Sequence, residues 1–306
     1  MKTSLSILLP IYNGDCVAFV EELSSEAQLL ATEVGLCYEI IVADDGSTDK
    51  LMQQRNEAIN ALPHCRYVLR GQNTGRAAIR NFLAQTAQYD WLLFLDSDML
   101  TISDSFLPAY LERPESELVV DGGVCTYADS RQRFPGNLRC LYECAATQHF
   151  DARQRQQDPY HDFHTANFLI SRSVMLRHPF DERFRRYGYE DVLMGKQLKK
   201  AGIAITHIDN PVVFKSFESN EHFIDKTEEG LRTLHQFRQE LRGYSRLLTF
   251  VEGIHLKPVR MLIRLWHRLV GPLERRSLCG SHPSLRLFKL YKLGYYLTLT
   301  KNDKQL

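Results

Sequence analysis

The sequence lacks the features of proteins with structural metal sites, of secreted proteins and of membrane-spanning proteins. Seven cysteines are scattered along it, with no CxxC pair and no zinc-site spacing: Cys16, Cys37, Cys65, Cys125, Cys140, Cys144 and Cys279. An odd number of dispersed cysteines favours reduced thiols in a cytosolic protein over a disulfide framework. No apolar run reaches the roughly 18 residues that a transmembrane helix needs. We therefore expect a cytoplasmic protein.

Internal repeats and low-complexity linkers are also absent, which excludes solenoid and disordered classes. The chain has 306 residues, of which 44% are hydrophobic and 25% charged. These fractions are those of ordinary globular proteins, and the length allows one large domain or two modest ones. The apolar stretch Leu5–Pro10 is too short for a signal peptide and is interpreted as a buried first strand.

Charge is unevenly distributed, although the formal net charge is only +1. From Arg242 to the end there are 13 Lys and Arg against 3 Asp and Glu, a net +10. The preceding residues carry 25 against 34, a net −9. This asymmetry suggests that the C-terminal part contacts a polyanion or a membrane surface.

The first half alternates short apolar runs with longer amphipathic stretches. The predicted strands are Leu5–Pro10, Tyr38–Ala43, Cys65–Leu69 and Trp91–Leu95, and the predicted helices lie near Cys16–Glu33, Thr48–Leu62 and Thr74–Gln88. This alternation is typical of βαβ units and predicts an α/β fold with a mostly parallel sheet covered by helices. Because ligands bind beyond the carboxyl ends of such strands, the residues after each strand are the first candidates for a site.

The second half is less regular and becomes helical towards its end. Further strands are predicted over Val119–Val124, Ala166–Ser171, Ala204–Ile208 and Val212–Phe214, and further helices within Pro135–Phe150 and over Glu190–Ala201, His222–Tyr244, Val259–Val270 and Leu285–Leu299. We place a soft domain boundary near residues 225–245. This divides the chain into a domain over residues 1–230 and a basic helical extension over residues 231–306.

Two pairs of carboxylates follow predicted strands. Asp96 and Asp98 come after the fourth strand, and such oxygen ligands suit Mg²⁺ or Mn²⁺, particularly when phosphates complete the shell. The alternative is a solvated turn. Asp44 and Asp45 come after the second strand, where a carboxylate could bind a nucleoside. The alternative there is a turn in which Ser47 caps the next helix.

Further charged residues lie at predicted helix starts. Arg76 and Arg80 are four residues apart and could reach a phosphate or a base, although a surface ion pair is favoured for Arg80. Glu190 and Asp191 open a helix, where either could serve as a general base. From that segment alone, stabilisation of the helix dipole is the favoured interpretation.

These segments acquire a common meaning when they are taken in order. The chain carries Pro10-Ile11-Tyr12-Asn13, then DDGSTD at 44–49, NTGRAAIRN at 73–81, LDSD at 95–98 and GYED at 188–191. In this order they resemble the motifs of glycosyltransferase family 2, the inverting enzymes of GT-A fold, over roughly residues 4–230. The resemblance implies a Rossmann-like mixed sheet flanked by helices.

The resemblance also implies roles for individual residues. In the donor site, Pro10 and Tyr12 flank the nucleobase, Asp45 with Asp44 binds the nucleoside, and Arg76 contacts the nucleotide. Asp98 binds the metal with Asp96 on the ribose or the metal shell, Asp191 is the catalytic base, and Glu190 contacts the acceptor or donor sugar. It implies Mn²⁺ or Mg²⁺ as cofactor and a nucleotide-sugar donor, with UDP the commonest nucleotide. The acceptor is expected to be a saccharide or lipid-linked saccharide for cell-surface polysaccharide or glycolipid synthesis, and no nucleic-acid partner is expected.

One position departs from the family pattern. Members often carry a histidine that completes the metal shell where this chain has Phe214. His207 or His222 could substitute for it, and a cluster at His161 and His164 is a further candidate for a metal site or the acceptor side. The third protein ligand of the metal is therefore left open.

The basic C-terminal part has two interpretations. Arg260, Arg264 and Arg268 repeat beside Trp266 and several leucines, a pattern that fits a helix lying on the inner face of the cytoplasmic membrane. Core packing gives the same periodicity, with the apolar side against the catalytic domain and the arginines in water.

Two other functions are weighed against transfer. A sugar nucleotidyltransferase would carry a Gly-rich, Arg-containing loop after the first strand, and Ile11-Tyr12-Asn13-Gly14 is not such a loop. A non-catalytic nucleotide-sugar-binding subunit is the other alternative.

Overall fold

The computed structural model describes residues 1–147 and 151–300, which form two compact units. Unit 1 comprises the described residues of Met1–Cys125, His149–Arg185 and Met194–Lys215, and unit 2 those of Thr126–Gln148, Arg186–Leu193 and Ser216–Leu306. The boundary predicted after residue 230 falls inside helix α10 (Asn220–Gln236), which belongs to unit 2. Residues 148–150 of the predicted helix within Pro135–Phe150, and residues 301–306 of the predicted extension, lie outside the described part.

Unit 1 is built on a seven-stranded sheet of order β3-β2-β1-β4-β8-β6-β9. Its strands are β1 (Ser4–Ile11), β2 (Cys37–Asp44), β3 (Cys65–Leu69), β4 (Trp91–Leu95), β6 (Val119–Asp121), β8 (Asn167–Ser171) and β9 (Thr206–His207). The pairs β3-β2, β2-β1, β1-β4 and β6-β9 are parallel, whereas β8 is antiparallel to both its neighbours. The predicted mixed, mostly parallel α/β sheet is thus confirmed.

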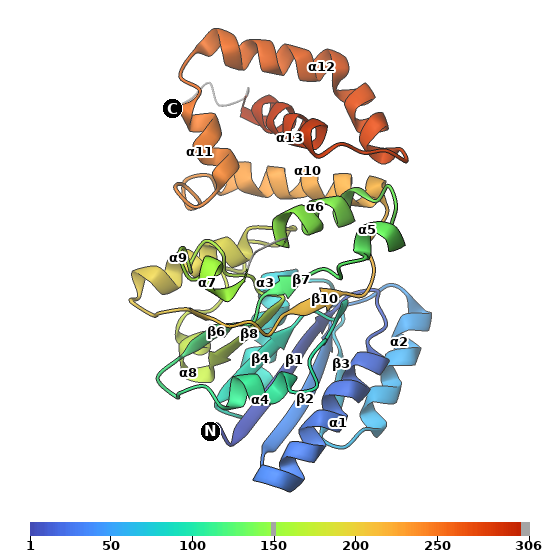
Figure 1. Cartoon of the computed structure of the whole chain (residues 1–306), viewed down its shortest axis with the longest axis vertical. Coiled ribbons are helices and arrows are strands. Elements are labelled where there is room, and N and C mark those ends of the chain that lie inside the picture. The colour runs from blue at the N-terminus through green and yellow to red at the C-terminus, as the bar shows by residue number, and fades with distance from the viewer. Residues whose placement is uncertain (148–150, 301–306) are drawn as a thin grey trace. The chain divides into compact units, whose positions relative to one another are not determined.

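The helices of unit 1 cover both faces of this sheet. They are α1 (Val17–Val34), α2 (Lys50–Asn56) with the 3₁₀ turn η1 (Glu57–Ala61), α3 (Arg76–Thr86), α4 (Phe106–Leu111), α7 (Ala152–Arg155), α8 (Arg172–Arg177) and most of α9 (Glu190–Lys200). Right-handed crossovers from β1 through β3 place α1 and α2 together on one face (Figure 1), and the return to β4 places α3 on the other. The chain therefore changes direction between β1 and β4, where open α/β sheets bind ligands.

The core on the α3 face explains why the strands are continuous apolar runs. Leu8, Ile41 and Phe94 from the sheet pack there against Ile79 and Leu83 of α3, all at most 2% exposed. Strands covered on both faces bury nearly every side chain, which is why β4 and the second half of β1 show no alternation with polar residues.

Helix ends show where local sequence decided the structure. Gly35 ends α1 at φ 71°, a left-handed conformation that glycine adopts without steric cost, and its N–H bonds Leu30 O. Asp49 is the N-cap of α2, and its carboxylate accepts from the N–H of Leu51 and Met52 at 3.0 and 3.2 Å. The interpretation of Ser47 as that cap is therefore wrong.

A small second sheet of unit 1 lies at the end of β4. Its order is β5-β10-β7, formed by β5 (Met99–Leu100), β10 (Val212–Phe214) and β7 (Val124–Cys125). Phe214 pairs with Met99, and the N–H of Lys215 bonds Asp98 O at 3.1 Å. This sheet fixes the chain after the Asp96–Asp98 turn, and β4 of the large sheet fixes the chain before it.

Unit 2 is helical. It contains α5 (Ser130–Arg133), α6 (Leu138–Thr147), α10, α11 (Arg246–Gly253), α12 (Lys257–Cys279), α13 (Leu285–Leu299) and the first turn of α9. Figure 1 shows α12 and α13 side by side above α10, around a core that includes Leu138, Phe223 and Phe288. The helix predicted over Val259–Val270 is longer than expected, because α12 continues through Pro272.

Candidate functional site

Residues that follow β1 and β2 are joined to each other in unit 1. The N–H of Asn13 donates to Ser47 Oγ at 2.7 Å, and its side-chain oxygen accepts from the N–H of Thr48 and Asp49 at 2.8 and 3.0 Å. Asn13 has φ 51°, a left-handed conformation that asparagine tolerates better than most residues. One side chain therefore holds two strand-end loops together.

Asp44 shapes the turn after β2. Its Oδ1 accepts from the N–H of Ser47 at 2.7 Å, and its Oδ2 accepts from the hydroxyl of Tyr67 on β3. Burial, and then the hydrogen bond to the Asp44 carboxylate, raise the pKa of Tyr67 above its usual value. Both oxygens of Asp44 thus serve the structure of the loops, and its proposed contact with a nucleoside stays a prediction.

Asp45 connects the β2 loop to the start of α3. Its carboxylate accepts from the N–H of Gly75 at 2.8 Å, the N–H and hydroxyl of Thr74 at 3.0 and 2.8 Å, and the guanidinium of Arg70 at 3.2 Å. Asp45 is only 4% exposed. A nucleoside bound by Asp45 would therefore share or replace one of these donors.

Two glycines let the loops approach this closely. Gly46 has φ 72°, and a Cβ there would lie 2.5 Å from the backbone of Gln72. Gly75 has φ 93°, and a Cβ there would lie 2.6 Å from Arg185 O. Each position therefore needs glycine both for its backbone conformation and for the contact.

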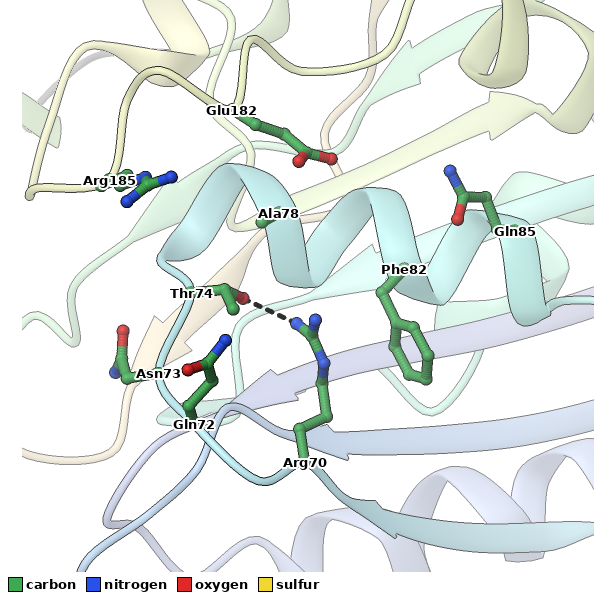
Figure 2. A pocket seen from close by; sticks show the side chains of 9 residues that line it. All are labelled: Arg70, Gln72, Asn73, Thr74, Ala78, Phe82, Gln85, Glu182 and Arg185. Atoms are coloured by element: carbon green, nitrogen blue, oxygen red, sulfur yellow. Dashed lines mark hydrogen bonds between the residues drawn. The ribbon is translucent and has the colours of Figure 1, made fainter.

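Arg70 was not singled out from the sequence, although it directly follows β3. It lines a pocket of about 380 Å³ together with Gln72, Asn73, Thr74, Ala78, Phe82, Gln85, Glu182 and Arg185. Figure 2 shows its guanidinium bonded to Thr74, at 2.7 Å, and close to Phe82, whose ring centroid is 4.8 Å away. The sequence signal that could have identified Arg70 is a basic residue directly after a predicted strand.

The remaining predicted donor-site residues of unit 1 lie at the same edge of the sheet. Pro10 is the penultimate residue of β1, and Tyr12, which follows the strand, is 49% exposed. Arg76 is the exposed first residue of α3. All three therefore belong to segments that the Asn13 and Asp45 hydrogen bonds hold together.

Asp96 is tied to α3 by a largely buried ion pair. Arg80 is 1% exposed, and its guanidinium donates to Asp96 Oδ1 at 2.7 Å. The interpretation of Arg80 as a surface ion pair is therefore wrong. The backbone N–H of Asp96 also bonds Ala166 O at 3.0 Å, so α3 and the residue that precedes β8 both fix its position.

Asp98 differs from Asp96 in its exposure. Its side chain is exposed at the turn between β4 and β5. Phe214 and Lys215 occupy the adjacent position, where the resemblance led us to expect a histidine. Among the described residues no three His, Cys, Asp or Glu side chains form a metal-binding cluster. Asp98 and Asp96 nevertheless fit Mg²⁺ or Mn²⁺, because these ions often take one or two carboxylates plus substrate phosphates.

The alternative histidine ligands have other contacts. His207 is buried, with Nε2 3.0 Å from Pro159 O and Nδ1 3.2 Å from Arg155 Nε, so neither nitrogen is available to a metal. His161 Nδ1 bonds Asp158, and His164 Nδ1 bonds Asp162 O. His222 lies in the first turn of α10 in unit 2.

Glu190 and Asp191 open α9 within unit 2. Gly188 before them has φ 93°, which glycine adopts without steric cost, whereas Tyr189, with its Cβ, is strained at φ 70°. Such conformations cost about 1–3 kcal/mol and cluster at functional sites. Glu190 is 5% exposed, whereas Asp191 is half-buried and its Oδ1 accepts from the next N–H at 2.7 Å.

Comparison with known proteins identifies relatives of this chain. The family model described as Glycosyl transferase family 2 matches residues 6–178, more than half of the chain. An uncharacterized glycosyltransferase of Haemophilus influenzae is 31% identical over 125 residues, which are 41% of this chain and 48% of that protein. Chondroitin synthase of Pasteurella multocida is 24% identical over 291 residues, 84% of this chain and 29% of that protein. The chain thus spans half or less of the length of these curated relatives.

Solved structures share the fold. The mannosyltransferase PcManGT from Pyrobaculum calidifontis, in complex with GDP-Man and Mn²⁺, gives a TM-score of 0.57 at 14% identity, over 100% of this chain and 89% of that one. Residues 1–349 of S. aureus TarS, in complex with UDP, give a TM-score of 0.50 at 17% identity, over 100% of this chain and 92% of that one.

Among the described residues, no helix combines the length and the apolar composition that crossing a membrane requires.

Proposed function

Because this chain belongs to glycosyltransferase family 2, we propose that it transfers a sugar from a nucleotide diphosphate to an acceptor hydroxyl, with inversion at the sugar carbon. The observation that carries the proposal is the joining of four strand-end segments of unit 1. Asn13 bonds Ser47, Asp45 bonds Gly75, and Arg80 bonds Asp96. A donor site assembled from distant segments needs such fixed loops, because catalysis depends on preorganised groups.

The donor would lie along this edge of the sheet. Pro10 and Tyr12 would flank the base, Asp45 would hold the nucleoside with Asp44 behind it, and Arg76 would contact the nucleotide. UDP is the nucleotide we propose, and the UDP bound to TarS in its structure supports that choice.

The diphosphate is the part of the donor that needs positive charge. Asp98, with Asp96 beside it, would hold Mn²⁺ or Mg²⁺, and the Mn²⁺ of the mannosyltransferase structure supports a divalent ion. The chemistry that such an ion supplies is neutralisation of the charge developing on the leaving group. Arg80, by pairing with Asp96, keeps that carboxylate oriented.

Proton removal is assigned to Asp191. As general base it would accept the proton of the acceptor hydroxyl while that oxygen attacks the sugar carbon opposite the leaving group. One displacement without an enzyme nucleophile gives inversion, through a transition state of oxocarbenium character like that of glycoside hydrolysis. Glu190 would contact the acceptor or donor sugar.

The acceptor is proposed to be a saccharide or a lipid-linked saccharide in the synthesis of a cell-surface polysaccharide or glycolipid. The similarity to chondroitin synthase supports a saccharide acceptor. We place the reaction in the cytoplasm, where nucleotide sugars and reduced thiols are both expected.

The first experiment is a donor screen. UDP-glucose, UDP-N-acetylglucosamine, UDP-glucuronate and GDP-mannose are each incubated with the protein and a mixture of mono- and oligosaccharide acceptors, with Mn²⁺ or with a chelator, and released nucleoside diphosphate is measured. We expect release from one donor, falling at least tenfold on chelation. Metal-dependent UDP binding without release from any donor would instead indicate a non-catalytic binding subunit.

Two variants separate binding from transfer. Asp98→Ala is expected to abolish Mn²⁺-dependent binding of UDP in calorimetry. Asp191→Asn is expected to bind UDP normally but to lose about 100- to 10,000-fold in transfer rate, because it lacks a general base. Asp104→Ala, at another exposed acid of unit 1, is the matched control for Asp98 and should bind UDP like the original protein. Full activity of Asp191→Asn would refute the assigned base.

A further inference from the structure

Helix α12 turns an apolar stripe outward. The stripe is defined as Leu262, Leu265, Trp266, Leu269 and Leu273, which are 68%, 52%, 50%, 70% and 65% exposed. Their spacing of three and four residues places them on one face of the helix. Unit 2 therefore does not cover the stripe, although Arg260 and Arg264 of the same helix are partly buried. The interpretation in which the apolar side packs against the catalytic domain stays a prediction.

The opposite side of α12 is fixed inside unit 2 by hydrogen bonds. Arg260 donates to Ile254 O and Val251 O at 2.6 and 3.0 Å, and Arg264 donates to Leu297 O at 2.8 Å. Rotation of the helix would break these bonds and leave both guanidinium groups without these acceptors. The outward direction of the stripe is therefore a consequence of packing within unit 2.

Acidic and aromatic groups add to this fixation. Glu274 is 3% exposed and accepts from the indole N–H of Trp266 at 2.8 Å, while Arg275 donates to Glu228 and Asp225 at 2.7 and 2.8 Å. The bond from Trp266 holds the polar atom of the indole, so the half-exposed ring offers mainly its apolar surface.

The exposed charges on α12 and α13 are all positive. Lys257, Arg268 and Arg276 on α12 are exposed and have no carboxylate partner within the described residues. Arg286 and Lys289 are exposed on α13. Between residues 257 and 300 the one acid is Glu274, which is buried. The surface of these two helices is therefore suited to an anionic partner.

We infer that α12 docks this chain on the surface of an anionic lipid bilayer, with the apolar stripe in the interface and the basic side chains at lipid phosphates. A helix with a polar side and many charges lies in the interface rather than crossing it. The inference stands apart from the proposed sugar transfer, because it rests on unit 2 alone.

Charge distinguishes this partner from a second copy of the chain. Two stripes packed together would bring like charges from both copies to one interface with no exposed acid to pair with them. Lipid phosphates supply the missing negative charge, and basic residues close to such a surface are strongly attracted to it.

Vesicle flotation of the full chain tests the inference. Vesicles of phosphatidylcholine alone are compared with vesicles containing 30% phosphatidylglycerol, about the composition of an anionic leaflet. We expect the chain to float with the anionic vesicles only. Leu262→Ser with Leu269→Ser should abolish flotation, and Arg268→Ser with Arg276→Ser should weaken partitioning about 30-fold.

A matched control uses leucines elsewhere that are also more than half exposed. Leu29→Ser with Leu51→Ser, at residues 56% and 53% exposed in unit 1, should leave flotation unchanged. Equal flotation of the α12 leucine variant and the original chain would overturn the inference. So would a dimer in sedimentation equilibrium that the same variant dissociates, if the original chain does not float, because a second copy would then cover the stripe.

Discussion

At the scale of single residues, the contact that matters most for the candidate donor site is the one between Arg80 and Asp96. The arginine is almost fully buried, whereas the carboxylate is 20% exposed at the edge of the sheet where β4 ends. Removing one member of a buried pair leaves the other charge without compensation, which costs more than the pair itself contributes. Arg80 therefore acts on the candidate metal site through Asp96 without facing solvent.

Arg80→Met is expected to destabilise the protein by about 3 kcal/mol, because Asp96 loses its partner. The free energy of unfolding is measured in urea. Arg113→Met, at an i,i+4 pair with Glu117 in which the arginine is 36% rather than 1% exposed, is the control and should cost less than about 1 kcal/mol. Similar losses in the two variants would show that the Arg80 pair is no stronger than a surface pair.

At the scale of elements, the loops after β1, β2 and β3 form one hydrogen-bonded assembly. Asn13 joins the first to the second, and Asp45 joins the second to the start of α3. None of these loops is a regular element, so side chains supply the bonds that a sheet would otherwise provide. The geometry of the edge depends on these few polar residues.

Asn13→Ala should therefore affect ligand binding more than folding. It removes the bonds to Thr48 and Asp49 while leaving β1 and β2 paired, so we expect a loss of about 1 kcal/mol in stability and at least tenfold weaker binding of UDP. Calorimetry with UDP and Mn²⁺ measures the second effect. Asn60→Ala, which removes a single bond to Tyr67 N in the middle of β3, is the control and should bind UDP normally.

At the scale of the whole molecule, a half-buried carboxyl makes stability depend on pH. Glu26 of α1 accepts from the N–H of Leu107 on α4 at 3.0 Å. Burial raises the pKa of Glu26 from 4.5 to about 7. The folded chain then binds more protons than the unfolded chain between these values, so Glu26 makes stability fall as pH rises from 4.5 to 7 and level off above 7.

Glu26→Gln should flatten this part of the pH profile, because glutamine stays neutral over the whole range. Urea unfolding at pH 5, 6 and 7 measures the slope for both proteins. Glu33→Gln, at an exposed residue of the same helix, should keep the original slope. An unchanged slope in the Glu26 variant would show that this carboxyl does not titrate with the raised pKa.

The sequence by itself determined the first four strands, their order along the chain and the residues at their ends, whereas β5 was not predicted and the strand predicted over Val119–Val124 is divided between β6 and β7. Buried parallel strands need continuous apolar runs, and the polar residues that end these runs must meet at one edge of the sheet. For that reason Asp45, Arg76 and Asp96 could be predicted at a common edge, and the family could be inferred from their order.

The tertiary structure decided how these side chains are used. Sequence spacing does not show that Arg80 is buried against Asp96, or that Asp44 accepts from the hydroxyl of Tyr67, because these contacts join residues far apart in the chain. The same holds for α12. Periodicity shows that a helix has an apolar and a polar side, but packing decides which side meets solvent, and in unit 2 Arg260 and Arg264 find their hydrogen-bond acceptors inside while the leucines remain outside.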